Sequence, residues 1–190
     1  MASSMRRRNA QAFRLAANID PERLMAKILV LYDTRSGNTQ KMAAAVAEGA
    51  KSLPDVEVTL KHVDEAQPSD LFEHDGIAVG SPTWCGGLSW KLKKFFDEST
   101  CVWGKVEDKV GCAFSTSGGL GGGSEITCLS ILSVLINYGM LVFGVTDYGA
   151  PGVTAHYGAV AVGEPSEQEL ASCRILGAKL VTHVKRVMGE

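Results

Sequence analysis

Side chains that bind anions gather in one short segment of this chain. Thr34, Ser36 and Thr39 carry hydroxyl groups, and Gly37 among them lets the backbone approach a ligand closely. An apolar run at residues 27–32 comes before this segment and an Ala-rich run follows it, which predicts a strand, a loop and a helix. This arrangement directs backbone N–H groups and a helix N-terminus at one place, so we expect a phosphate to bind there.

Two better-known phosphate motifs are missing from this loop. It lacks the Gly-Lys-Ser/Thr ending of a P-loop and the Gly-x-Gly-x-x-Gly of a dinucleotide site. We therefore expect a phosphomonoester held mostly by neutral hydrogen bonds, with Arg35 either over the phosphate or facing water. The alternative is a solvated loop that only caps a helix. The residues assigned to the phosphate are Thr34, Arg35, Ser36, Gly37, Asn38 and Thr39.

Two further loops follow predicted buried strands. One comes after the apolar run 76–79 and precedes an amphipathic helix at 88–97, and the other comes after 110–114 and precedes a helix at 124–138. In a doubly wound parallel sheet such loops meet at the carboxyl edge, where ligands bind. We expect these two loops to flank a planar ring. The residues assigned to the ring are Pro82, Thr83, Trp84, Cys85, Gly86, Gly87, Ser115, Thr116, Ser117, Gly118 and Gly119.

In this order the loops resemble those of flavodoxin-like FMN proteins, and most closely the WrbA-type NAD(P)H:quinone oxidoreductases. The similar segments are 80–87, 114–123 and Tyr157-Gly158-Ala159, and the resemblance runs from about Met25 to the C-terminus. The second loop departs from the family, because Trp84 and Cys85 stand where the family has Arg and Phe. The segment 146–156 is also shorter than the family segment that helps to build the quinone pocket and the tetramer.

The pattern and the resemblance imply an α/β fold of three layers, α/β/α and flavodoxin-like, with a five-stranded parallel sheet of order 2-1-3-4-5 in residues 25–190. Alternating residues at 56–63 predict an edge strand, and 141–145 is expected to be the fifth strand. Ser166 and Glu169 form a capping-box pattern that opens the last helix. Its inner face is expected to hold Leu170, Cys173, Gly177, Leu180, Val181, Val184 and Val187.

Several aromatic and His residues have open assignments. Trp84 either stacks on the flavin ring or packs on the sheet edge. Tyr138 stands where the family often has a His near the flavin, so it contacts the ring edge or is a core residue. By resemblance, Trp103 and Tyr157 line the substrate face. His156 either protonates a quinol oxygen or is a surface residue, and no catalytic residue is assigned.

The function favoured by these observations is an FMN-dependent oxidoreductase that transfers electrons from NAD(P)H to a quinone. The alternative is a flavodoxin-type carrier that moves electrons between redox partners, and a third class is a non-catalytic binding protein on the same fold. Carriers are usually strongly acidic, which steers them to basic partners. The formal charge of −2 is small, which favours the reductase. The choice between NADH and NADPH stays open.

Composition limits the remaining possibilities. The 190 residues suit one domain, and the small charge argues against nucleic acid as a main partner. No apolar run approaches the ~18 residues of a transmembrane helix. Five cysteines, without a Cys-x-x-Cys, signal neither a disulfide framework nor a metal site and suggest reduced thiols in the cytoplasm. By resemblance we expect a homo-oligomer, a dimer or a tetramer.

Residues 1–24 differ from the rest of the chain. They are Arg-rich and contain no acidic residue before Asp20, which is the composition of an organelle transit segment. The other interpretation is an extension that is irrelevant to function. Because Met25, Ala26 and Lys27 lead directly into the first predicted strand, we favour the extension.

Overall fold

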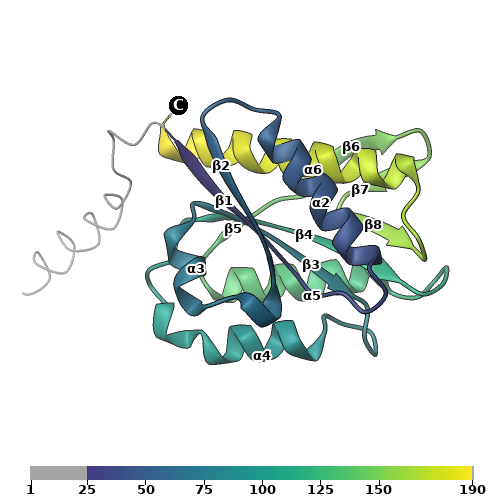
Figure 1. Cartoon of the computed structure of the whole chain (residues 1–190), viewed down its shortest axis with the longest axis horizontal. Helices are drawn as coiled ribbons and strands as arrows, with labels where there is room; N and C mark the ends of the chain where they lie inside the picture. The colour runs from purple at the N-terminus through teal and green to yellow at the C-terminus, as the bar shows by residue number, and fades with distance from the viewer. Residues whose placement is uncertain (1–24, 190) are drawn as a thin grey trace, which may run out of the picture.

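A parallel sheet forms the centre of the protein, which is described by a computed structural model for residues 25–189 (Figure 1). The strand order is β2-β1-β3-β4-β5, which confirms the order predicted from the sequence. The first four strands are β1 (Ala26–Tyr32), β2 (Val56–His62), β3 (Gly76–Pro82) and β4 (Val110–Ser117).

Helices cover both faces of this sheet (Figure 1). The strands β1, β3 and β4 are therefore almost wholly buried, as their continuous apolar runs predict. The strand β2 lies at the edge, where its alternating residues stay half-buried. One face carries α2 (Asn38–Lys51) and α6 (Glu167–Met188), and the other carries α3 (Pro68–Glu73), α4 (Trp90–Glu98) and α5 (Ser124–Asn137).

Each layer of helices packs on one face of the sheet, and the two layers form two apolar cores. Cys173, Leu180 and Val184 of α6 pack with the inner face of α2 on one side, and Cys128 and Ile131 of α5 pack on the other. The capping box of Ser166 and Glu169 opens α6 as predicted. The predicted inner face of α6 ends before Val187, which is 37% exposed in the last turn.

The fifth strand differs from its prediction. Of the predicted strand at 141–145, only β5 (Leu141–Val142) pairs with β4, at the start of that strand. A separate strand, β8 (Ala159–Val162), pairs with the end of β4 at Phe114–Ser117. Between them the chain leaves the sheet as an antiparallel hairpin of β6 (Val145–Ala150) and β7 (Val153–Ala155). Short apolar runs fit either arrangement, and only the pairing with β4 decides between them.

Two short 3₁₀ helices complete the elements, η2 (Val63–Glu65) and η3 (Thr100–Val102). The predicted extension, residues 1–24, lies outside the described residues, so its dispensability stays a prediction. Within residues 25–189, no helix combines the length and the apolar character needed to cross a membrane.

Candidate functional site

The three loops predicted to bind a ligand lie at one edge of the sheet. They leave the carboxyl ends of the neighbouring strands β1, β3 and β4, whose registers align Tyr32 with Gly80 and Pro82 with Thr116. We call this side of the sheet the loop edge. The helices α2, α4 and α5 begin there, so their C-terminal ends lie toward the opposite, amino edge.

The first loop is shaped to receive an anion. Gly37 has a φ of +88°, which favours glycine, and it is the N-cap of α2. Its N–H donates to Thr34 Oγ1 at 3.0 Å, which folds the loop into a tight turn. The first turn of α2 contains no acidic side chain, and no side chain caps it. Its first N–H groups have no acceptor within the helix, so they are available to a phosphate.

A network of hydroxyl groups joins the three loops below their surface. Thr39 Oγ1 lies 2.9 Å from Thr116 Oγ1, which connects the first loop to the end of β4. Thr127 Oγ1 donates to Thr83 Oγ1 at 3.0 Å, and Thr83 Oγ1 lies 3.3 Å from Ser115 Oγ. Buried hydroxyl groups that satisfy one another hold a surface rigidly, so these bonds fix the loops relative to one another.

The second loop ends in a two-residue turn. Trp84 and Gly87 exchange backbone hydrogen bonds of 2.9 and 3.0 Å, and the residues between them have positive φ, +47° at Cys85 and +85° at Gly86. A cysteine rarely adopts this conformation, and such strain is typical of functional loops. The Trp84 side chain is 40% exposed, and the Arg35 guanidinium lies 5.1 Å from the centre of its ring. Arg35 thus covers Trp84.

The third loop presents bare backbone. A Cβ atom added at Gly118 or Gly119 would meet no atom within 4 Å, so the space above the loop is open. Ser117 Oγ donates to the carbonyl oxygen of Gly119 and accepts from Ser124 Oγ, which holds the start of the loop in place. Leu120 at its tip is 96% exposed. The sequence analysis missed Leu120, although a single large apolar residue within a glycine run is a usable signal.

These features fit FMN. The first loop offers neutral donors to a phosphomonoester, and the other two offer backbone groups and the apolar surfaces of Trp84 and Leu120 to a flat, hydrogen-bonding ring. Thr127 was also missed by the sequence analysis. It is a buried polar residue on the inner face of α5, where the next buried residues are Cys128, Ile131 and Leu132, and that contrast could have identified it.

A charged cluster beside the first loop was not foreseen. Asp33 is only 5% exposed, and its carboxylate lies 3.4 Å from His62 Nε2 at the end of β2. Asp64 in η2 accepts a hydrogen bond of 2.6 Å from Lys91 in the first turn of α4, and this bond lowers the pKa of Asp64. The cluster fixes the end of β2 beside the site.

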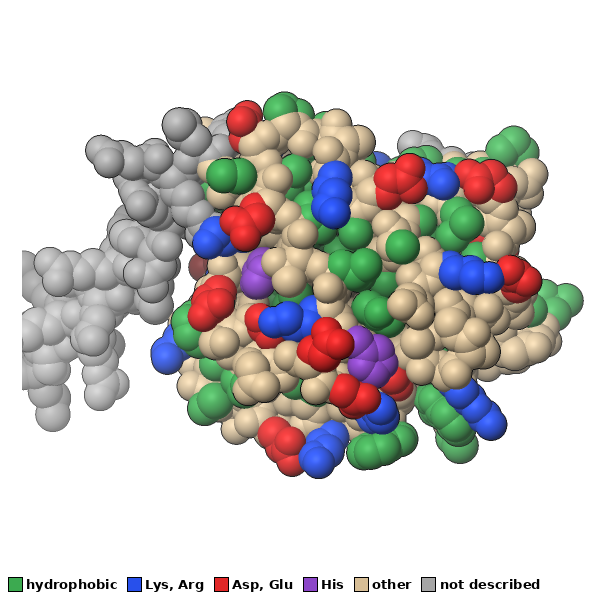
Figure 2. Space-filling model, in the orientation of Figure 1, with side chains coloured by type: hydrophobic (Ala, Val, Ile, Leu, Met, Phe, Trp, Pro, Cys, Tyr) green, Lys and Arg blue, Asp and Glu red, His purple; other side chains and the backbone are tan. Residues whose placement is uncertain are grey.

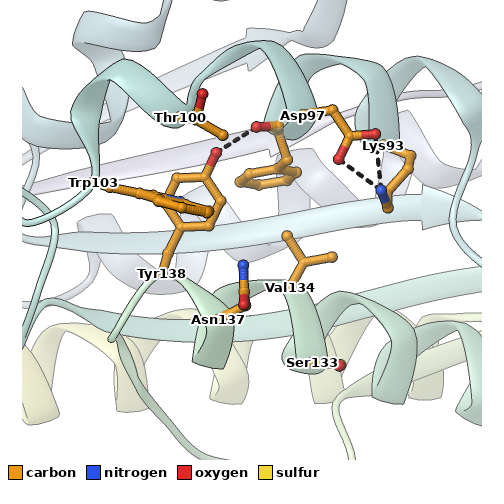
Figure 3. Close-up of a pocket in the computed structure, with 9 residues that line it drawn as sticks. Lys93, Asp97, Thr100, Trp103, Ser133, Val134, Asn137 and Tyr138 are labelled. Carbon is orange, nitrogen blue, oxygen red and sulfur yellow. Dashed lines mark hydrogen bonds and ion pairs between the residues drawn. The ribbon is translucent and has the colours of Figure 1, made fainter.

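Trp103, expected at the substrate face, and Tyr138, expected either at the ring edge or in the core, lie together away from the loop edge. Tyr138 follows the C-terminal end of α5, three residues before Leu141, which pairs with the first residue of β4 at the amino edge. The rings of Trp103 and Tyr138 meet edge to face at 5.9 Å (Figure 3). The Tyr138 hydroxyl donates to the carbonyl of Phe96, and burial raises the pKa of Tyr138 to about 12. Tyr138 is buried and belongs to the core on this face of the sheet. The 14 residues of α5 separate it from the third loop.

His156 and Tyr157 lie at the side of the sheet. They precede β8, and a Cβ atom at Gly158 would lie 2.1 Å from the carbonyl oxygen of Ala113, in the middle of β4. His156 Nδ1 lies 3.3 Å from the carbonyl oxygen of Val145, and Tyr157 is 49% exposed. His156 and Tyr157 lie nearer to the third loop than Trp103 does, but they lie outside that loop.

Comparisons with known proteins identify the family of the chain. The Flavodoxin family model matches residues 30–150. A flavodoxin from Aquifex aeolicus is 58% identical over 162 residues, covering 84% of this chain and 88% of the relative. An NAD(P)H dehydrogenase (quinone) from Methylocella silvestris is 33% identical, covering 87% of this chain and 100% of the relative.

A solved structure shares both the fold and part of the sequence. It is that of a flavodoxin, WrbA-like protein from Agrobacterium tumefaciens, with a TM-score of 0.70 and 30% identity over 85% of this chain and 98% of that chain. The family model covers more than half of the chain, and it includes the three loops at the carboxyl edge. The chain therefore belongs to the flavodoxin family, as a flavodoxin-like FMN protein that resembles WrbA.

Proposed function

We propose that this protein is a flavodoxin-type electron carrier that uses FMN to move electrons between redox partners. The observation that carries this proposal is the separation of Trp103 from the loop edge. An aromatic wall for a quinone or nicotinamide was one reason to expect a reductase, and Trp103 packs against Tyr138 instead. The 58% identity with a flavodoxin supports the same choice.

FMN supplies the redox chemistry when it is bound, and the protein binds, orients and shields it. We assign the phosphate to the backbone N–H groups of Asn38 and Thr39 and to the hydroxyl groups of Thr34 and Ser36. The positive end of α2 favours the phosphate charge, because no acidic side chain occupies its first turn. Arg35 contributes by holding Trp84 rather than as the main phosphate ligand.

We assign the flavin ring to the space between the second and third loops. Trp84 and Leu120 are the side chains that can cover its faces, and the N–H groups of Gly118 and Gly119 in the open third loop are donors for its polar edge. The hydroxyl network of Thr83, Ser115 and Thr127 keeps these groups in place before the ring arrives. Such preorganisation lowers the entropy that binding must offset.

The surface charges create no strong single-sign field, so this carrier would differ from strongly acidic carriers in how it meets its partners. Figure 2 shows Lys and Arg side chains interspersed with Asp and Glu on the visible face, without a large patch of either sign. Near the site, Lys91 is paired with Asp64, and farther along α4 Lys93 is paired with Asp97. We therefore expect electron exchange with partners to depend only weakly on ionic strength.

The second candidate is the NAD(P)H:quinone oxidoreductase. The 33% identity with a quinone dehydrogenase favours it, as does the half-exposed Tyr157, a flat surface beside the third loop. In this case His156 and Tyr157 would border the substrate. For both candidates we place the protein in the cytoplasm, because all five cysteines are unpaired thiols.

Stopped-flow reduction distinguishes the two candidates. The FMN-loaded protein is mixed with NADH or with NADPH, and free FMN under the same conditions is the control. If the protein is a carrier, NADH and NADPH should reduce its FMN no faster than they reduce free FMN. A chemical reductant should still reduce the bound FMN fully. Rapid reduction by either nicotinamide, followed by rapid reoxidation by a benzoquinone, would reject the carrier and support the reductase. Mass spectrometry of the released flavin should give FMN rather than FAD.

A further inference from the structure

The last residue of β2, His62, lies between two carboxylates beside the phosphate loop. Its Nε2 is 3.4 Å from Asp33 Oδ1, and its Nδ1 is 3.6 Å from Asp64 Oδ2. Asp33 is buried and directly precedes Thr34, the first residue assigned to the phosphate. Histidine is the side chain that changes its charge near neutral pH, so a proton can be gained or lost directly beside the site.

The hydrogen bonds of the His62 ring correspond to its neutral form. The backbone N–H of Asp64 donates to His62 Nδ1 at 3.2 Å and so caps η2. A ring nitrogen that accepts a hydrogen bond carries no proton, so the single proton of the neutral ring is on Nε2, on the side of Asp33. A second proton must therefore be added at Nδ1. It displaces the N–H of Asp64, and the Asp64 carboxylate is close enough to become the new partner.

Charged groups of three neighbouring elements surround this ring. The strand β1 contributes Asp33 and Tyr32, whose ring meets the imidazole edge to face at 5.3 Å. Burial, and then the charge of Glu65 in η2, raises the pKa of Tyr32, so its hydroxyl stays neutral. The helix α4 contributes Lys91, whose ammonium is held by Asp64 at 2.6 Å. Three carboxylates face one ammonium here, so the surroundings are negative and favour a second proton on the ring.

A phosphate bound at the first loop adds roughly two more negative charges near neutral pH. It lies next to Asp33 in the chain, and the two anions repel each other unless a positive charge offsets them. We infer that His62 and Asp33 form a proton-binding pair coupled to the phosphate, so that FMN binding draws a proton onto His62 and FMN release frees it. His62 is thus a positioning residue for the cofactor. This inference rests on the phosphate assignment proposed above and not on the choice between carrier and reductase.

The coupling acts in both directions, as binding equilibria require. If FMN moves the titration of His62 to higher pH by about half a unit, the protonated protein binds FMN about threefold more tightly than the neutral protein. FMN affinity should therefore rise, by part of this factor, as the pH falls from about 8 to about 7. Below this range the phosphate itself begins to gain a proton, which acts in the opposite direction.

NMR titration of the imidazole signals, with and without FMN, tests the coupling in the full chain. The signal that is absent in His62→Gln identifies His62 among the four histidines, and its ring contact with Tyr32 identifies it independently. FMN should move this titration to higher pH and leave that of His183, on α6, unchanged. The amide signal of Asp64 should change with the same midpoint, because its N–H loses its acceptor. Equal midpoints with and without FMN would overturn the inference, since a purely structural His62 predicts no shift.

Calorimetry in two buffers with different ionisation enthalpies measures the protons taken up on binding. At about pH 7.5, within the usual range of histidine, FMN should draw protons onto the wild type and onto His183→Gln, and fewer onto His62→Gln. Circular dichroism checks that each variant is folded. Equal uptake by the wild type and His62→Gln, or no uptake by either, would also overturn the inference.

Riboflavin, which lacks the phosphate, separates this inference from the assignment on which it rests. It should bind more weakly than FMN and without the proton uptake. If FMN binds more tightly than riboflavin but takes up no proton, the coupling is wrong and the phosphate assignment stands. If riboflavin binds as tightly as FMN, the phosphate assignment fails, and the coupling fails with it.

Discussion

Thr39 Oγ1 and Thr116 Oγ1 lie 2.9 Å apart, buried beneath the surface of the candidate FMN site. These residues are 77 positions apart in the chain, one in the first turn of α2 and the other near the end of β4. Their hydrogen bond joins the phosphate loop to the strand that leads into the ring loop. The site is thus one connected unit, and changes in one loop should affect the others.

Ser36→Glu should weaken FMN binding by tenfold or more. The new carboxylate would face the phosphate at the start of α2, and tenfold corresponds to about 1.4 kcal/mol of repulsion. Ser36→Gln has nearly the same size without the charge, so it should bind FMN much more tightly than the Glu variant. Fluorescence titration of FMN measures both constants. Equal losses in the two variants would show that the effect is steric and that the phosphate lies elsewhere.

FMN should protect Cys85 from thiol reagents but should not protect Cys101. Both are exposed, whereas burial raises the pKa of Cys112, Cys128 and Cys173 and keeps them unreactive in the folded protein. Cys85 lies in the second loop, and Cys101 lies in η3. Mass spectrometry after alkylation, with and without FMN, identifies the labelled residue. Protection of both residues, or of neither, would argue against the proposed ring position.

Thr127→Val should destabilise the protein by about 1 kcal/mol, because it removes the hydrogen bond to Thr83 and keeps the shape of the side chain. In a domain of this size this lowers Tm by about 2–4 °C. FMN binding should also weaken, since the second loop loses its support. Thr182→Val is the matched control, because its hydroxyl bonds only within α6, to Ala178. If FMN affinity changed equally in both variants, the network would have no special role in the site.

Trp103→Ala should leave FMN affinity and the rate of flavin reduction unchanged, since Trp103 packs on Tyr138 and away from the loop edge. Trp84→Ala should instead weaken FMN binding by about fivefold, the equivalent of about 1 kcal/mol for one aromatic stacking contact. Titration and stopped-flow measurements on both variants provide the comparison. A higher KM for NADH or a quinone in Trp103→Ala would restore this residue to the substrate site.

Stability should fall as the pH drops below about 6.5, partly because of His183. Burial of this ring, followed by the nearby charges of Arg186 and Lys179, lowers the pKa of His183 in the folded protein. The unfolded chain then binds more protons in this range, so the contribution is fully present above about pH 6.5 and is lost toward the lowered folded pKa. Melting curves should show a smaller pH dependence for His183→Gln. An identical profile in this variant would assign the effect to other groups.

The sequence by itself determined the fold and the loop edge. Continuous apolar strands alternating with helices indicate a parallel sheet with right-handed crossovers and helices on both faces, and the alternating edge strand together with the resemblance of the loops selects the order 2-1-3-4-5. The three loops follow strands that pair directly, so their meeting followed from the strand order alone. The segments of Ser36, Trp84 and Gly118 could therefore be placed at one edge of the sheet from the sequence.

Two kinds of feature became clear only in the folded chain. These are the position of a residue at one end of a helix or the other, and the strand with which a short apolar run pairs. Tyr138 and Trp103 were assigned by resemblance, but α5 carries Tyr138 to the amino edge, and local patterns do not report which end of a helix faces a ligand. The fifth strand was read as one run, but β4 accepts two separate partners, and pairing between distant segments selects between similar short runs. The bonds from Thr39 to Thr116 and from Thr127 to Thr83 join hydroxyl groups far apart in the chain, and only folding brings such groups together.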